Sequence, residues 1–183
     1  MKSSIFCFMM LMLALWSCNT IKKSSADASV PEGYKLLWAE EFESGEAPNP
    51  AFWSFEEGFK RNREMQWYQS ENATVSDGLL TIEGRKEQVK NTSYDAKSRD
   101  WSKSREFAEY TSSSINTNGK FEFQFGVVEV RAKIDTASGM WPAIWTLGVT
   151  KPWPANGEID IMEYYMVNGN PTILANAAWA HPD

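Results

Sequence analysis

Residues 121–134 decide the fold class, and their sequence is FEFQFGVVEVRAKI. Phenylalanines alternate with polar residues over 121–125, which is the two-residue period of a strand with one buried face. After Gly126 the alternation resumes over 127–134, where apolar residues alternate with charged ones. No window of the chain shows the period of an amphipathic helix. This stretch therefore predicts β-strands.

Further short apolar runs continue this pattern on both sides. One begins at Leu36, and another covers 79–82 after the turn signal Asp77-Gly78. The exception is Lys86–Glu109, a long polar stretch that we interpret as a surface loop. Many short strands at this spacing predict an all-β sandwich or barrel.

The composition limits the chemistry. With 183 residues, 43% of them hydrophobic, the chain is long enough for one domain with a core. Its formal charge of −6 argues against a nucleic-acid partner. The one histidine is His181 and the two cysteines are Cys7 and Cys18, which argues against a Ser-His-Asp triad or a zinc site. Any catalysis is therefore expected to use carboxylates.

The N-terminus is typical of an export signal. Lys2 precedes the apolar run Ile5–Leu15, which has the length of a signal-peptide core and is too short to span a bilayer comfortably. The following residues 15–18, LWSC, resemble a bacterial lipobox, which implies cleavage before Cys18 and lipidation of its thiol. Plain secretion stays an alternative, because Trp16 is bulky for that motif.

These features divide the chain into three parts. Residues 1–17 are the predicted signal peptide, residues 18–32 are the lipidated cysteine with a flexible tether, and residues 33–183 are the folded domain. The expected location is the bacterial cell envelope, reached by export across the inner membrane, with the lipid anchor as the only membrane contact.

The most informative chemical motif is GEIDIMEY at residues 157–164. Glu158 and Asp160 are two positions apart, so both project from one face of a strand. Glu163 would point into the core in a regular strand, where an unpaired carboxylate is costly. One extra residue at 161–162, a β-bulge, would bring Glu163 back to the other two acids.

The expected separation of the acids suggests a mechanism. With the bulge, the carboxyl groups of Glu158 and Glu163 are expected to lie about 5–7 Å apart. Retaining glycosidases hold theirs at about 5–5.5 Å, and inverting enzymes hold theirs further apart. The charge of Asp160 between them is expected to raise the pKa of whichever neighbour must stay protonated. A calcium site or a plain solvent-exposed face are the alternatives.

The motif also resembles the signature of glycoside hydrolase family 16, in its bulge-containing form Glu-x-Asp-x-x-Glu. The likeness runs in order from about Tyr34 to Trp179. Besides the acids it rests on residues 64–68, 125–133, 139–145 and 153–157, which read EMQWY, FGVVEVRAK, GMWPAIW and WPANG.

The resemblance implies roles for the acids and a fold. Glu158 would be the nucleophile and Glu163 the general acid/base, with Asp160 assisting between them. The fold would be an antiparallel β-sandwich, a concanavalin-like jelly roll, with a substrate cleft on the concave sheet.

The resemblance also implies substrate-binding residues. Trp141 and Trp145 would stack on sugar rings, the alternative for each being core packing. Glu64 and Arg131 would hydrogen-bond sugar hydroxyls, the alternative being a structural ion pair.

Within the family, the chain most resembles laminarinase-like enzymes that act on β-1,3 or mixed β-1,3/1,4 glucan. The expected protein is a monomeric, retaining endo-β-glucanase that binds polysaccharide and needs no cofactor or catalytic metal, while a structural calcium ion is left open. The alternatives are a non-catalytic carbohydrate-binding sandwich, a member acting on agar- or carrageenan-type galactan, and a calcium-dependent structural domain.

Two departures from the family pattern stand out. Many laminarinase-like members carry a histidine on the strand after the catalytic one, where this chain has Asn176 and Trp179 as polar and aromatic candidates. The chain also stops at Asp183, whereas the family's sandwich continues for several strands, so we expect C-terminal strands to be missing. Residues 19–183 alone are then expected to be poorly soluble or inactive, since sheet edges would be uncovered.

Overall fold

The computed structural model describes residues 30–180. The predicted signal peptide, Cys18, the tether up to residue 29 and His181 lie outside the described residues. The chain divides into two compact units, one ending at Glu41 and one beginning at Phe42. We describe them separately.

The described part of the first unit, residues 30–41, contains no strand. Its one regular feature is a turn in which the amide of Tyr34 donates to the carbonyl of Pro31 at 3.1 Å. The strand predicted to begin at Leu36 is therefore not formed. The apolar side chains of Leu36 and Leu37 are exposed, so this short run lacks the buried face that a strand prediction assumes.

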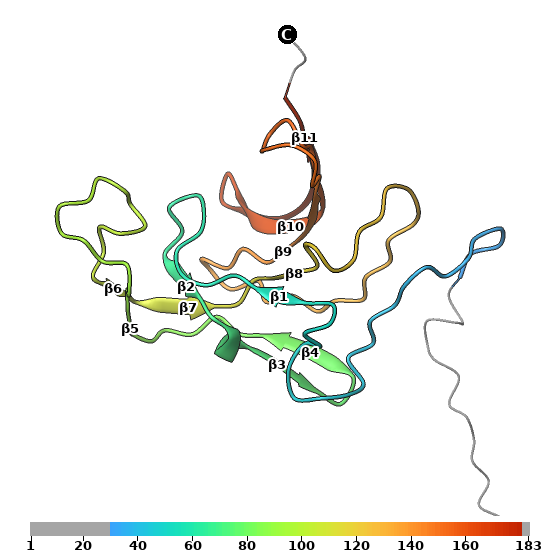
Figure 1. The fold of residues 1–183 in the computed structure, drawn as a ribbon, viewed down its shortest axis with the longest axis horizontal. Helices are drawn as coiled ribbons and strands as arrows, with labels where there is room; N and C mark the ends of the chain where they lie inside the picture. The colour runs from blue at the N-terminus through green and yellow to red at the C-terminus, as the bar shows by residue number, and fades with distance from the viewer. Residues whose placement is uncertain (1–29, 181–183) are drawn as a thin grey trace, which may run out of the picture. The chain divides into compact units, whose positions relative to one another are not determined.

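The second unit is built from short β-strands (Figure 1). One three-residue 3-10 turn, Ser70–Asn72, interrupts them, and no α-helix occurs among residues 30–180. Accordingly, this described part of the chain offers no helix that could cross a membrane. The strands are β1 (Ser54–Phe55), β2 (Gln66–Tyr68), β3 (Ala73–Ser76), β4 (Leu79–Ile82), β5 (Val89–Lys90), β6 (Phe107–Ala108), β7 (Tyr110–Ser112), β8 (Ile115–Asn116), β9 (Ala143–Leu147), β10 (Glu158–Val167) and β11 (Asn170–Ala178).

The longest strands form an antiparallel sheet in the order β11-β10-β9. The other strands pair two by two: β1 with β8, β3 with β4 and β5 with β6 are antiparallel, and β2 with β7 is parallel. The predicted all-β class is confirmed. Because β10 is the central strand of its sheet, its side chains have neighbours on both sides, which matters for the acids that it carries.

The β3–β4 hairpin forms where the sequence predicts it. Asp77 and Gly78 both adopt positive φ angles, 53° and 73°, which is the backbone that a tight two-residue hairpin turn needs. Ala73 and Val75 of β3 are buried, while Thr74 and Ser76, which alternate with them, are exposed. The turn signal and the alternation thus fix this register.

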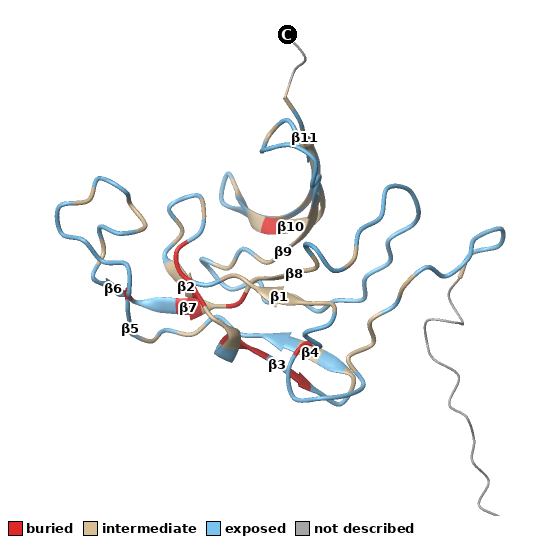
Figure 2. Cartoon of the chain, in the orientation of Figure 1, coloured by how far each residue is buried: buried red, intermediate tan, exposed pale blue. Residues whose placement is uncertain are grey.

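A buried polar network joins this hairpin to the neighbouring strands. The amide of Asn72, which is fully buried, donates to the Thr111 hydroxyl and to the carbonyl of Glu83, both at 2.9 Å. The buried Thr111 hydroxyl donates in turn to Glu87 at 2.5 Å. Figure 2 shows buried residues on β3, near the end of β7 and in the chain beside β2. These bonds offset the cost of burying polar groups.

The predicted surface loop Lys86–Glu109 is confirmed in outline. Only β5 and β6, two residues each, interrupt it. Asn91, 1% exposed, closes its base by donating to the carbonyls of Ser102 and Arg105 at 2.8 and 2.9 Å. The loop is therefore ordered by its own hydrogen bonds.

The strands predicted from residues 121–134 are not formed in the described structure. This segment pairs with no other described strand, and Phe125 is 85% exposed. The alternation is typical of a half-buried strand, but it does not specify a partner strand. Within residues 30–180 no strand pairs with this segment, so it does not become part of a sheet.

Candidate active site

The central strand β10 contains the predicted β-bulge. On one side Asp160 pairs with Asn176, and the next paired residue, Glu163, faces Leu174. Three steps along β10 therefore match two along β11. On the other side the register shifts between Asp160 and Met162. The extra residue lies at 161–162, and this prediction is confirmed.

The bulge returns Glu163 to the face of Asp160. Residues directly opposite each other on neighbouring strands project from the same face. Asn176 lies opposite Asp160, and its side-chain amide donates to Oε2 of Glu163 at 2.7 Å. The next residue, Tyr164, is 3% exposed, and its hydroxyl donates to the carbonyl of Thr136 at 2.9 Å. The acid thus lies on the accessible face, while the tyrosine anchors the strand.

Two indole rings hold the outer acids. Nε1 of Trp153 donates to Oε2 of Glu158 at 2.6 Å, and Nε1 of Trp141 donates to Oε1 of Glu163 at 3.1 Å. Both rings are about half exposed or more, Trp153 at 62% and Trp141 at 48%. Trp141 therefore lies beside Glu163, and its stacking on sugar rings stays a prediction.

The environment raises the pKa of Asp160. Desolvation by its surroundings is the main cause, followed by the negative charges of Glu163 and Glu158. Hydrogen bonding to Asn176 acts in the opposite direction. Crowding of the three carboxyl groups thus raises the pKa of the middle acid, Asp160, itself. A raised pKa disfavours the ionised form, so the charge of Asp160 costs stability once the group ionises.

We expect Asp160→Asn to raise the melting temperature at neutral pH. A pKa raised above the ordinary 3.8 means that the folded state holds the proton longer than the unfolded state. Wild-type stability therefore falls as the pH rises through this window, and the variant escapes that loss. The melting temperatures of the two full-length proteins should differ at pH 7 and converge below about pH 3.5.

Asp100→Asn is the matched control, because the pKa of Asp100 is lowered by hydrogen bonds from the side chain and backbone of Ser102. It should lower the melting temperature at pH 7. A destabilising Asp160→Asn would contradict the electrostatic explanation.

A second group of side chains adjoins the acids through Trp145. This ring lies on β9 opposite Asp160, and the guanidinium of Arg61 sits 5.3 Å from its centroid. Arg61 also lies 5.5 Å from the ring centroid of Tyr68 and forms an ion pair with Glu56. The cation thus joins the loop before β2 to the acid-bearing sheet.

Glu64 belongs to the same group. Its Oε2 accepts hydrogen bonds from the Tyr68 hydroxyl at 2.9 Å and from the Gln66 amide at 3.0 Å. Burial, followed by the charge of Glu64, raises the pKa of Tyr68 to about 12. The hydroxyl therefore remains a hydrogen-bond donor at every physiological pH, and Glu64 is held in a fixed orientation.

The structure does not bring Arg131 into this arrangement. It is exposed, and it lies in segment 121–134, which has no partner strand among the described residues. The sequence, in turn, did not identify Arg61, Tyr68 and Trp153 as site residues. A signal for Trp153 was present, since it precedes the acids in the matched segment WPANG.

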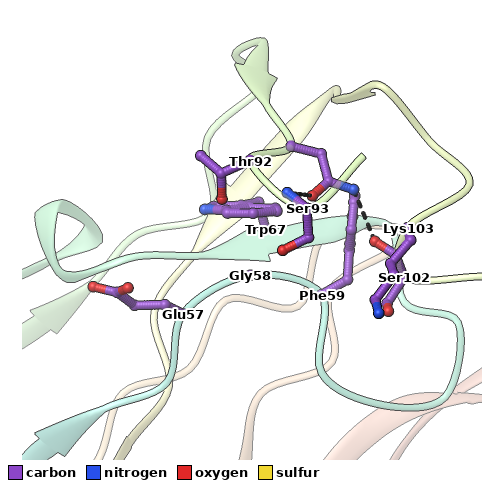
Figure 3. Close-up of a pocket in the computed structure, with 9 residues that line it drawn as sticks. Glu57, Gly58, Phe59, Trp67, Thr92, Ser93, Ser102 and Lys103 are labelled. Atoms are coloured by element: carbon purple, nitrogen blue, oxygen red, sulfur yellow. Dashed lines mark hydrogen bonds between the residues drawn. The ribbon is translucent and has the colours of Figure 1, made fainter. Parts of the chain in front are cut away.

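The described residues form two cavities but no evident metal site. Within residues 30–180, no group of three or more His, Cys, Asp or Glu side chains is arranged to hold a metal ion. A cavity of about 370 Å³ borders residues 133–136. Another of about 240 Å³ lies between Trp67 and the loop around Asn91 (Figure 3). The acids of β10, which are partly exposed, line neither of these two cavities.

Comparison with known proteins places the chain among carbohydrate-active enzymes. Residues 50–177 match the family model "XgeA-like, catalytic GH16 domain". A β-glucanase of Rhodothermus marinus is 33% identical over 174 residues, covering 90% of this chain and 54% of that enzyme. The chain thus spans about half the length of this curated relative.

Two solved structures are similar in fold and sequence. A non-specific endo-β-1,3(4)-glucanase from family GH16, co-crystallised with a glucan oligosaccharide, is 37% identical with a TM-score of 0.64; the match covers 82% of this chain and 58% of that one. A chain from a study of endo-acting O-glycanases that human gut bacteria express to initiate mucin breakdown is 33% identical with a TM-score of 0.69, covering 82% and 61%. The predicted jelly-roll sandwich class is confirmed by these likenesses.

Proposed function

Because the chain belongs to glycoside hydrolase family 16, we propose that the whole protein is a retaining endo-β-glucanase acting on β-1,3 or mixed β-1,3/1,4 glucan. The observation that carries this proposal is the bulge in β10, which places Glu158, Asp160 and Glu163 on one accessible face. A double-displacement glycosidase uses two carboxyl groups, one as the nucleophile and one as the general acid/base, and one face of the strand supplies both here.

In the first step Glu158 acts as the nucleophile. One of its carboxylate oxygens forms a bond to the anomeric carbon while the glycosidic bond breaks, and Glu163 gives its proton to the leaving oxygen. The indole N–H of Trp153 fixes the second oxygen of Glu158. This bond orients the nucleophile, although it also competes for electron density on that carboxylate.

In the second step Glu163 acts as the base. It takes a proton from water, the water oxygen bonds to the anomeric carbon, and the ester to Glu158 breaks. Asp160 assists from between them. Since its pKa is raised by desolvation and by both neighbours, it can share a proton with Glu158 as the charge on that carboxylate changes.

Sugar binding is assigned to the aromatic and polar groups around the acids. The exposed face of Trp141 and the ring of Trp145 would stack on sugar rings, and Glu64 would accept from sugar hydroxyls. Arg131 would contribute only if segment 121–134 approached the substrate.

We also propose a cellular location, an oligomeric state and a cofactor requirement. The protein would act as a monomer on polysaccharide at the bacterial cell envelope, held there by a lipid on Cys18. Catalysis would need no cofactor, because the two carboxyl groups supply nucleophile, acid and base. A structural calcium ion elsewhere in the sandwich stays open.

The competing substrates are an agar- or carrageenan-type galactan and a mucin O-glycan. One of the similar solved chains comes from work on endo-acting O-glycanases. A non-catalytic binding role is less consistent with the sequence, since a degenerate binder is expected to lose at least one of the three acids.

The test is product analysis with the full-length protein. Laminarin, barley glucan, agarose and mucin would each be incubated, and the products identified together with their initial anomeric form by proton NMR. We expect oligosaccharides from laminarin or barley glucan, released first as the β-anomer. Release of the α-anomer would exclude a retaining mechanism, and products from mucin alone would replace glucan as the substrate.

A further inference from the structure

Each oxygen of the Glu163 carboxyl group has its own donor. Nε1 of Trp141 donates to Oε1 at 3.1 Å, and the side-chain amide of Asn176 donates to Oε2 at 2.7 Å. The two donors come from opposite sides, since Trp141 precedes β9 and Asn176 lies on β11. The carboxyl plane is therefore held at two points.

The donors matter because the surrounding charges are mostly negative. Glu158 and Asp160 lie on the same strand as Glu163. The flanking strands β9 (AIWTL) and β11 (NPTILANAA) contain no ionisable residue. The cation that adjoins this face is Arg61, whose guanidinium stacks on Trp145 and is paired with Glu56. The two neutral N–H donors of Trp141 and Asn176 are therefore the contacts that fix the orientation of the Glu163 carboxyl group.

The two donors differ in what a substitution reveals. Trp141 also offers a ring that would stack on sugar, so its replacement would change substrate binding and orientation together. Asn176 has a small side chain, and its amide donates a hydrogen bond to Glu163. It also slightly opposes the rise in the pKa of Asp160. Substituting Asn176 therefore isolates the contribution of its hydrogen bond to Glu163.

We propose that Asn176 is a positioning residue, which holds Oε2 of Glu163 in the orientation for proton transfer. The inference rests on the proposed function of Glu163 as the acid/base. Each carboxyl oxygen has two lone pairs, and a donor on one of them leaves the other to face the glycosidic oxygen or the attacking water. Without Asn176, the carboxyl group would be held by Trp141 alone and could rotate.

Loss of the hydrogen bond from Asn176 has a measurable consequence. The pH at which a general acid loses its catalytic proton sets the basic limb of the pH–rate profile. Hydrogen bonds to charged groups are worth enough to move such a limb by about one pH unit. Because Asn176 is exposed, we expect a shift of about half that size to the full unit.

The test compares Asn176→Leu with the full-length wild type by two measurements. The first is the midpoint of the Glu163 carboxyl resonance in a ¹³C NMR titration, which needs no activity. The second is kcat and KM for glucan across the pH range. Asn170→Leu is the matched control, since Asn170 lies on the same strand opposite Val167, at the end away from the acids.

We expect Asn176→Leu to move the NMR midpoint and the basic limb upward by similar amounts, and to lower kcat about tenfold with little change in KM. Asn176→Gln, which keeps the amide donor, should restore part of both shifts, and Asn170→Leu should change neither. An unchanged or lowered midpoint in Asn176→Leu would overturn the inference even if hydrolysis is normal. A raised midpoint in a protein that hydrolyses no glycan would support the contact and refute the proposed function instead.

Discussion

Replacing Glu158 by glutamine is expected to abolish hydrolysis, with kcat falling by at least about 10³-fold. The amide nitrogen is not a nucleophile towards the anomeric carbon, so the glycosyl-enzyme ester cannot form. Folding should be preserved, because the amide oxygen of glutamine can still accept the hydrogen bond that Trp153 donates to Glu158 at 2.6 Å. The loss should therefore appear in kcat and not in thermal stability.

The measurement combines activity with binding. Hydrolysis of laminarin and barley glucan by full-length Glu158→Gln would be compared with its affinity for glucan oligosaccharides by calorimetry. Glu122→Gln is the control, since Glu122 is an exposed glutamate in segment 121–134 and has no proposed role. Retained binding with lost hydrolysis supports the assignment. Undiminished hydrolysis by Glu158→Gln would show that another group is the nucleophile.

The bulge could be predicted from the sequence because two physical rules conflict there. Strand alternation points Glu163 into the core, and the cost of burying an unpaired carboxylate forbids that position. One extra residue resolves the conflict, and the register of β10 against both neighbours shows it at 161–162. The distance between the acids, in contrast, depends on side-chain rotamers, and the estimate of about 5–7 Å stays a prediction.

The partners of the acids could not be predicted in the same way. Trp153 and Asn176 contact Glu158 and Glu163 because of how a loop and a neighbouring strand lie against β10. Alternation says which face a residue occupies, but not which residue of another strand lies opposite. Arg61 is a clearer case, since its contact with Trp145 joins segments more than eighty residues apart in sequence.

Segment 121–134 is a case in which the local sequence pattern predicted strands that the structure does not contain. It has the clearest strand alternation in the chain, yet it pairs with no other described strand. The stability of a strand comes from cross-strand pairs and from the buried face, and both depend on a partner that the local pattern does not identify. The hairpin at Asp77-Gly78 was predicted correctly because its two strands are adjacent in sequence.

Replacing Glu163 by alanine should have the second-largest effect, and one that depends on the substrate. Hydrolysis of glucan, whose leaving oxygen needs a proton, is expected to fall by about 10²–10⁴-fold. An aryl glucoside with an acidic phenol needs no proton, so its first step should remain fast. Water then lacks the base that Glu163 supplies, and the glycosyl-enzyme on Glu158 should accumulate after a burst of phenol.

Azide distinguishes a lost base from a damaged site. The anion needs no deprotonation, and removal of the Glu163 side chain leaves room for it beside Trp141 and Asn176, whose N–H groups have lost their acceptor. We expect azide to restore turnover of the aryl glucoside by Glu163→Ala and to give the β-glycosyl azide, because attack comes from the face opposite Glu158. The Glu122→Gln control should show no azide effect. Failure of azide to restore turnover, in a variant that still shows the phenol burst, would mean that Glu163 is not the base of the second step.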